Sequence, residues 1–363
     1  MSVHKFSEDD WNLQTISDTD GQTNRQAELS KFDRKLTSGW EKAMSQGHFK
    51  FKLEKGKLQT KIIPGKKKYV VQLNVPRFQE KRKMDVIRSL KHPFQAEKFN
   101  FTKIKPEEIL FELVKETNSN GEQQTNGCYD NTAVEHQKKD LIIINVSPME
   151  YGHILIVPDV YSLAPQVLTV KSLELALETI LLSSHRGFHV GFNSLCAFAS
   201  VNHLHLHAYY LEHELFVETC PVQHLCGDLY ELDEMPVKGF AFQLHGSTVQ
   251  KLARTLHKVT SCLHDQEIAH NLHLSRGTVF GTDKTETIRI FLWPRKKVIG
   301  ENDLAAFNAA FVELAGHLPI KVADLFDGLT EESINETIRS AALEDGEYGA
   351  LKATVMELCR TCH

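Results

Sequence analysis

The stretch Asn202–Leu211 reads NHLHLHAYYL and places a histidine at every second position, at His203, His205 and His207. On a β-strand successive side chains point to opposite faces, so the three imidazoles share one face and the leucines between them share the other. Histidine makes up 19 of the 363 residues, so three histidines within five positions are not expected by chance. The alternation predicts a strand that starts near Val201, with its apolar face on a core and its imidazole face along a cleft.

The surrounding sequence predicts a mixed array of strands and helices. Apolar runs at 141–146 and 153–158 flank a Pro/Gly turn and predict a hairpin. Other expected elements are strands at 69–75, 188–193, 271–275 and 288–294, helices over 171–186 and 303–316, a surface loop over 118–137, and one or two helices in the tail at 330–360. The order strand, turn, strand ending in proline, helix occurs twice, about 135 residues apart, which suggests two related halves.

Composition argues against several classes of partner. The net charge of -5 provides no overall basic surface for nucleic acid. No apolar run approaches the roughly 20 residues of a membrane span, and the first residues lack the apolar core of a secretory signal. The seven cysteines are odd in number and scattered, as in proteins of a reducing compartment. We therefore expect a cytoplasmic protein without nucleic-acid or membrane partners.

Three interpretations of the imidazole face compete. It could be an incidental solvated face, a metal site built from histidines at i and i+2, or a site of nucleophilic catalysis at phosphorus. Residues 193–211 contain no Asp or Glu that would complete a metal site, but they do contain neutral polar side chains such as Asn193 and Ser200. Upstream, His153 begins the second strand of the hairpin and could reach the same cleft.

Two linked motifs resemble a known superfamily. The run from His203 to Tyr209 resembles the His-φ-His-φ-His-φ-φ signature of the histidine triad superfamily, and Pro148–Pro158 resembles its upstream Pro-x-x-x-Gly-His-φ-φ-φ-φ-Pro element. Segments 92–113, 199–211 and 307–321 are similar to the GDP-D-glucose phosphorylase family of animals. That family is related to plant GDP-L-galactose phosphorylases and, more distantly, to galactose-1-phosphate uridylyltransferase.

The resemblance, which extends from about Leu58 to Leu325, implies an architecture. It implies an α+β fold with a histidine triad-like antiparallel sheet and flanking helices, in two related halves as in galactose-1-phosphate uridylyltransferase. The expected division is a polar N-terminal arm over 1–57, a half carrying the active site over 58–240, and a degenerate half with C-terminal helices over 241–363.

The resemblance also implies an activity and a set of catalytic residues. It implies a nucleotidyltransferase that converts GDP-D-glucose and inorganic phosphate to GDP and D-glucose 1-phosphate, with no cofactor, no metal and a possible homodimer. His205 would be the nucleophile that carries GMP, with a ring nitrogen held by a backbone carbonyl near His203. His207 and His153 would donate hydrogen bonds to phosphate oxygens.

The substrate-binding residues are harder to place from the sequence. Asn193 and Ser200 match polar positions that contact the phosphates or ribose in the superfamily. Further candidates for base or phosphate contacts are Asn74, Arg77, Phe78, Arg276 and the lysines Lys66, Lys67 and Lys68.

One departure leaves the acceptor open. The plant and uridylyltransferase relatives tend to carry glutamine at the third triad position, whereas many histidine triad hydrolases carry histidine, as this chain does at His207. The flanking segments favour the phosphorylase. A nucleotide hydrolase of the histidine triad type, a metal-dependent hydrolase and a non-enzymatic nucleotide-binding protein are the alternatives.

Overall fold

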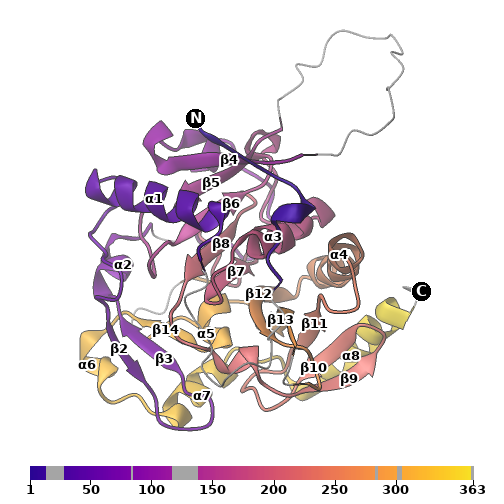
Figure 1. The fold of residues 1–363 in the computed structure, drawn as a ribbon. Helices are drawn as coiled ribbons and strands as arrows, with labels where there is room; N and C mark the ends of the chain where they lie inside the picture. The colour runs from indigo at the N-terminus through magenta and orange to yellow at the C-terminus, as the bar shows by residue number, and fades with distance from the viewer. Residues whose placement is uncertain (14–27, 83–84, 117–137, 283–284, 301–304, 361–363) are drawn as a thin grey trace, which may run out of the picture.

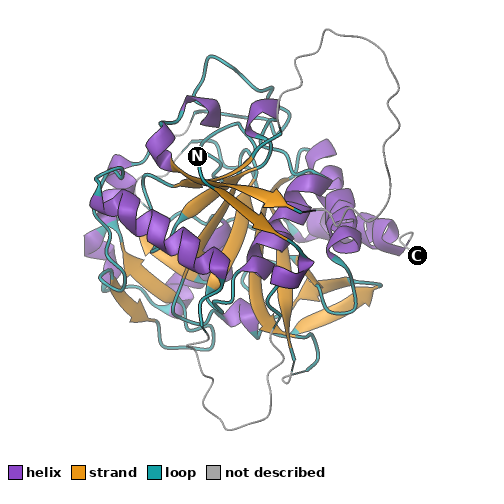
Figure 2. Ribbon diagram, turned by 45° about the horizontal axis from the view of Figure 1, so that its top comes forward, coloured by secondary structure: helices purple, strands orange, loops and turns teal. Residues whose placement is uncertain are grey.

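Two β-sheets form the centre of the molecule, and helices lie around them (Figure 1, Figure 2). The computed structural model describes residues 1–13, 28–82, 85–116, 138–282, 285–300 and 305–360. The loop expected at 118–137 lies outside these ranges.

The larger sheet has eleven strands within the described residues. In spatial order they are β1 (Val3–Phe6), β4 (Ile109–Lys115), β5 (Asp140–Ile144), β6 (Ile154–Val157), β8 (Leu206–Tyr210), β7 (Phe188–Asn193), β12 (Ala269–Thr278), β13 (Glu286–Arg295), β11 (Phe240–Gln243), β10 (Leu229–Leu232) and β9 (Val222–Cys226). The smaller sheet has the order β14 (His317–Ile320), β3 (Val70–Leu73), β2 (Gln59–Ile62). The α-helices are α1 (Lys31–Ser45), α2 (Val75–Glu80), α3 (Val170–Leu182), α4 (Val249–Asp265), α5 (Phe311–Ala315), α6 (Ala323–Phe326), α7 (Glu331–Arg339) and α8 (Asp345–Arg360).

Both sheets mix parallel and antiparallel pairs. In the larger sheet β1 and β4 are parallel and the remaining pairs are antiparallel. The predicted α+β class is therefore confirmed, with a mixed sheet in place of a purely antiparallel one.

The two faces of the larger sheet have different coverings. Alternate residues of the central strands, such as Leu206 and Ala208 on β8, join an apolar core with side chains of α1, α3, α4 and α8. The residues between them, such as Tyr209, face a second core shared with the smaller sheet. The period of two predicted for the histidine segment therefore separates the helical layer from the other face of the sheet, where the histidines lie.

The larger sheet contains the same strand order twice. Strands β4, β5 and β6, then α3, then β7 and β8 pair in the order β4-β5-β6-β8-β7. Strands β9, β10 and β11, then α4, then β12 and β13 pair in the order β9-β10-β11-β13-β12. The two sets meet where β7 pairs antiparallel with β12, with Asn193 opposite Asn271.

This order corrects the correspondence expected from the sequence. The predicted repeat matched the hairpin of β5 and β6 to that of β12 and β13. By strand order, however, β12 and β13 take the places of β7 and β8. The sequence pattern misled because any buried hairpin followed by a helix produces it.

Two predicted elements are shorter than expected. The histidine strand begins at Leu206, so His203 and His205 precede it in an irregular segment. The helix expected over 303–316 is α5 alone, and residues 301–304 are not described. Side chains hold the segment before α5 in a non-helical form, since Arg295 donates to the Ala309 carbonyl and Lys321 donates to Asn308 at 3.1 Å.

The N-terminal region is part of the fold where it is described. Strand β1 pairs with β4, and α1 buries Phe32, Leu36 and Trp40 in the core beneath the larger sheet. The polar N-terminal arm predicted over 1–57 therefore contributes a strand and a helix that pack on the larger sheet. Polar composition concealed an amphipathic helix whose apolar residues recur at a spacing of four.

Candidate active site

His205 lies at the wall of a large pocket with one ring nitrogen already engaged. Its Nδ1 is 2.8 Å from the backbone carbonyl of His203, which can only accept, so Nδ1 carries the proton. The lone pair is therefore on Nε2. The side chain lines the pocket while only 3% exposed, and burial lowers the pKa of His205 to about 4. The imidazole is thus neutral at pH 7, as a nucleophile must be, and the expected carbonyl near His203 is confirmed.

A relay of hydrogen bonds sets the tautomer of His207. The Met149 N–H donates to Nδ1 of His153 at 3.0 Å, so a neutral His153 carries its proton on Nε2. That Nε2 is 3.1 Å from Nδ1 of His207, which must then accept. The proton of His207 is left on its own Nε2 as a donor. Burial is the main cause that lowers the pKa of both histidines well below the usual value.

His153 and His203 support the site without lining the pocket. His153 is completely buried and its Nε2 faces Nδ1 of His207, so its side chain does not reach the pocket wall, where the sequence predicts a phosphate contact. His203 accepts a hydrogen bond at Nδ1 from the Phe101 N–H at 3.0 Å and packs against the Phe101 ring. Its carbonyl, rather than its imidazole, is what touches His205.

Gln166 holds the backbone around His205 and was not singled out from the sequence. Its amide nitrogen donates to the carbonyls of Asn193 and His205 at 3.0 Å each, and its oxygen accepts from the His205 N–H at 2.9 Å. The side chain is 2% exposed. A loop glutamine far from the motif in sequence carries no local signal of this role.

Phe311 packs on the ring of His207, with ring centroids 5.4 Å apart. Gly191 lies opposite His207 on β7 and makes room for this contact. A Cβ at Gly191 would approach the Phe311 ring to 2.0 Å, so a larger residue would displace Phe311 from the pocket wall.

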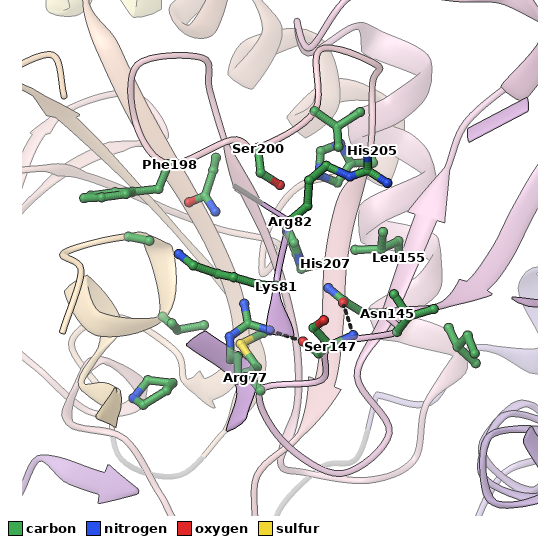
Figure 3. A pocket seen from close by; sticks show the side chains of 18 of the residues that line it. Arg77, Lys81, Arg82, Asn145, Ser147, Leu155, Phe198, Ser200, His205 and His207 are labelled. Carbon is green, nitrogen blue, oxygen red and sulfur yellow. Dashed lines mark hydrogen bonds between the residues drawn. The ribbon is translucent and has the colours of Figure 1, made fainter. Parts of the chain in front are cut away.

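Polar and cationic side chains surround the two histidines in Figure 3. Asn193 and Ser200 line the pocket, as expected from the sequence. Arg77 and Lys81 lie one helical turn apart and both line the pocket, where Arg77 donates to the Ser147 carbonyl (Figure 3). Arg77 and Phe78, both candidates from the sequence, line the pocket.

Other lining residues are Lys50, Asn145 and Glu313, which were not singled out from the sequence. Lys81 and Arg82 line the pocket too, and they belong to the basic run 81–83, which could attract a polyanionic ligand. Glu313 is 3% exposed, and burial raises its pKa to about 8.

An apolar region adjoins the histidines. The pocket spans about 1200 Å³, including the part open to solvent. Its apolar lining includes Phe99, Phe101, Ile104, Ile143 and Leu155. The Phe101 ring lies 5.0 Å from that of His205, and Arg82 stacks over Phe99 at 3.6 Å. Such a wall suits a flat aromatic ligand beside His205.

Three predicted substrate contacts do not line the pocket. Asn74 is completely buried and donates to the carbonyls of Pro148 and Met149 at 3.2 and 3.1 Å, so it holds the turn before His153. Lys68 is exposed. Arg276 donates to the carbonyls of Ile180 and Ser183 at the end of α3, where a cation stabilises the last turn.

Lys66 and Lys67 are also held away from the pocket. Lys66 pairs with Glu234 at 2.6 Å, and the backbone N–H of Lys67 donates to Glu331 at 2.8 Å. The lysine run is therefore a surface feature, as most basic runs are.

Among the described residues no three His, Cys, Asp or Glu side chains are grouped as metal ligands. The imidazoles of the triad each turn Nδ1 to a different protein partner. No helix in the described part of the chain combines the length and apolarity needed to span a membrane.

Comparison with known families and proteins gives consistent matches. The family model described as "GDPGP1-like, N-terminal domain" matches residues 31–209, and "GDPGP1-like, C-terminal domain" matches residues 212–362. The chain is 39% identical over 364 residues to "GDP-D-glucose phosphorylase 1" of Xenopus laevis, covering 92% of this chain and 89% of that protein. It is 40% identical over 344 residues to the protein of the same name from Danio rerio, covering 93% of each.

The fold resembles a solved structure. Yeast Ap4A phosphorylase Apa2 in complex with Ap4A superimposes with a TM-score of 0.57 and 15% sequence identity, over 87% of this chain and 99% of that chain. At this identity the likeness concerns the fold.

Proposed function

The chain belongs to the GDPGP1-like family of GDP-D-glucose phosphorylases, and from this premise we infer that it converts GDP-D-glucose and inorganic phosphate to GDP and D-glucose 1-phosphate. The observation that carries the inference is the geometry of His205. A neutral imidazole with its Nδ1 proton held by a carbonyl presents Nε2 to a pocket lined by cations and an aromatic wall. We assign the residues below their roles on this basis.

In the first step Nε2 of His205 attacks the α-phosphorus of GDP-glucose. The bond from that phosphorus to the oxygen bridging to the β-phosphate breaks, and glucose 1-phosphate leaves. GMP remains on Nε2 of His205, and the ring then carries a positive charge. The His203 carbonyl, which accepts from Nδ1–H, stabilises this charge.

Donors around the phosphorus stabilise the transition state. Negative charge grows on the non-bridging oxygens, and donors held in place beforehand stabilise it at little cost of reorganisation. In this proposal Nε2–H of His207 and the amide of Asn193 supply such donors. Arg77 and Lys81 supply positive charge for the phosphates.

In the second step inorganic phosphate attacks the guanylylated phosphorus, the bond to His205 breaks, and GDP leaves. Water is the competing acceptor because His207 occupies a position that is histidine in many hydrolases. The cationic wall of the pocket favours phosphate over water.

The test measures glucose 1-phosphate from GDP-glucose with and without inorganic phosphate. We expect turnover that requires phosphate, and an acid-labile GMP adduct on the protein when phosphate is omitted. Equal turnover without phosphate would identify a hydrolase. His205→Ala should abolish both turnover and adduct without changing Tm by more than a few degrees, and an active His205→Ala protein would exclude the covalent route. Loss of activity with a chelator would favour a metal-dependent hydrolase.

We further propose that the two halves of the larger sheet are related, the second having lost the catalytic histidines. The identical strand order of β4–β8 and β9–β13, each with one helix between its third and fourth strands, supports this relation. On this proposal the junction lies between Tyr210 and Val222, in place of the boundary at residue 240 expected from the sequence.

A cytoplasmic location and a homodimer are also proposals. Scattered cysteines suit a reducing compartment, and β1 and β9 end the larger sheet at its two edges. Light scattering coupled to size exclusion would show a mass near twice 41.3 kDa for a dimer.

A further inference from the structure

The amide of Asn193 has a defined orientation. Its Oδ1 accepts from Nδ2 of Asn271 at 2.6 Å and from the Phe311 N–H at 3.1 Å. A carbonyl oxygen has two acceptor sites, so both are used. The side chain is 6% exposed and lines the pocket beside the triad. Its NH2 group is therefore the part available to a ligand.

Asn271 in turn has only one orientation that satisfies its partners. Its Nδ2 donates to Asn193 and also to the Ala197 carbonyl at 2.9 Å. Its Oδ1 accepts from Nη1 of Arg295 at 3.3 Å. A flipped amide would turn Oδ1 of Asn271 toward two acceptors, the Asn193 Oδ1 and the Ala197 carbonyl, and would turn its NH2 toward the guanidinium of Arg295. Asn271 is 0% exposed, so water could not satisfy these groups. Unsatisfied polar atoms at such depth are costly, so the flip is disfavoured.

Arg295 anchors the end of the relay. It is 3% exposed, and it also donates to the Ala309 carbonyl just before α5. Asn271 and Arg295 both come from the second half of the larger sheet, on β12 and β13, whereas Asn193 ends β7.

We propose that Asn271, held by Arg295, is a positioning residue that fixes the Asn193 amide with its NH2 toward the reacting phosphate. The proposal rests on the proposed function, in which that phosphate is the α-phosphate of GDP-glucose. A fixed amide donates to a phosphoryl oxygen, whereas a flipped amide would present an acceptor oxygen to an anion. The second half thereby contributes to catalysis without touching the substrate.

The sharpest variant is Asn271→Asp. A carboxylate keeps the shape and the contact with Arg295, but it has no proton to donate to Oδ1 of Asn193. The Asn193 amide should therefore turn its NH2 to the new carboxylate and its oxygen to the pocket. We expect kcat to fall about 100-fold, in the range of losing one preorganised donor, with a smaller change in KM.

A double-mutant cycle separates positioning from a structural role. In the Asn193→Ala background, Asn271→Asp should lower kcat by less than about threefold, because the amide through which it acts is gone. Asn335→Asp is the matched control, since Asn335 is 5% exposed and bonds Tyr69 away from the pocket. It should leave kcat unchanged. Equal losses from Asn271→Asp in both backgrounds would overturn the proposal.

The same double-mutant cycle can be measured on GDP affinity by calorimetry, which does not depend on catalytic turnover. Asn271→Asp should weaken GDP binding in the wild-type background and not in the Asn193→Ala background. If the wild-type protein releases no glucose 1-phosphate, the proposed function fails, and the GDP cycle still decides the positioning role. Additive effects on GDP affinity would reject it.

Discussion

At the scale of single residues, the tautomer of His207 decides which substitutions the site tolerates. A glutamine could accept from Nε2–H of His153 with its oxygen and donate to phosphate with its nitrogen, the role proposed for His207. We expect His207→Gln to keep kcat within about tenfold of wild type, and the apolar His207→Leu to lose about 100- to 1,000-fold. Steady-state assays with GDP-glucose and phosphate measure both. A glutamine variant as inactive as the leucine variant would contradict the relay through Met149 and His153.

The ionisation of His205 predicts the pH dependence of the first step. Only the neutral ring can attack, and burial holds its pKa at about 4. We expect the rate of glucose 1-phosphate release without added phosphate to stay level from pH 8 to 5 and to fall on approach to pH 4. Rapid-quench measurements show this, with tryptophan fluorescence confirming folded protein at each pH. A midpoint near 6.5, the value of an exposed histidine, would contradict a buried neutral nucleophile.

At the scale of secondary-structure elements, α1 stabilises the turn that carries His153. Nε1 of Trp40 donates to the His153 carbonyl at 3.2 Å, and its ring packs on Tyr151 with centroids 5.2 Å apart. Trp40 is 1% exposed.

Trp40→Ala should therefore lower the free energy of unfolding by about 3–5 kcal/mol, as truncation of a buried aromatic side chain does. Lys42→Ala, an exposed position on the same helix, is the control and should change it by less than about 0.5 kcal/mol. Urea unfolding measures both. If Trp40→Ala left the free energy of unfolding unchanged, α1 would be only loosely attached to the sheet.

At the scale of the whole molecule, buried histidines determine stability in acid. Among the described residues seven histidines are buried, and burial lowers the pKa of each: His153, His189, His203, His205, His270, His273 and His317. The unfolded chain binds their protons near pH 6.5, whereas the folded chain binds them only at lower pH, with a pKa of about 4 for His203, His205 and His270. The stability they contribute is therefore complete above about pH 6.5 and decreases as pH falls.

At pH 5 a histidine with a folded pKa of about 4 destabilises the fold by about 2 kcal/mol. Buried carboxyls such as Glu218, whose pKa burial raises to about 8, act in the opposite direction. In the described part of the chain burial raises the pKa of four buried carboxyls, at Glu150, Glu178, Glu218 and Glu313. The seven buried histidines outnumber them, so the histidines dominate the change of stability with pH. We expect Tm to fall steeply between pH 6.5 and 4, which calorimetry measures. A constant Tm over this range would contradict neutral buried histidines.

Local sequence patterns were enough to predict many of the strands and the position of His205. Continuous apolar runs around a Pro/Gly turn identified β5 and β6, and short strand-like segments identified β7, β12 and β13. The period of two in the histidine segment separated the imidazoles from the leucines, because alternation records which face is buried. The spacing of the triad and its upstream turn also led to the family and to His205.

Only the tertiary structure decided which side chains surround His205. Gln166, Asn271 and Trp40 act across large sequence separations, so no local period or composition marks them. The sequence suggested Arg276 as a phosphate contact because arginine commonly binds phosphate. Its position on β12 instead directs its guanidinium to the carbonyls at the end of α3. The sequence specifies which chemistry is available, and the folding of distant strands into one sheet decides which groups meet.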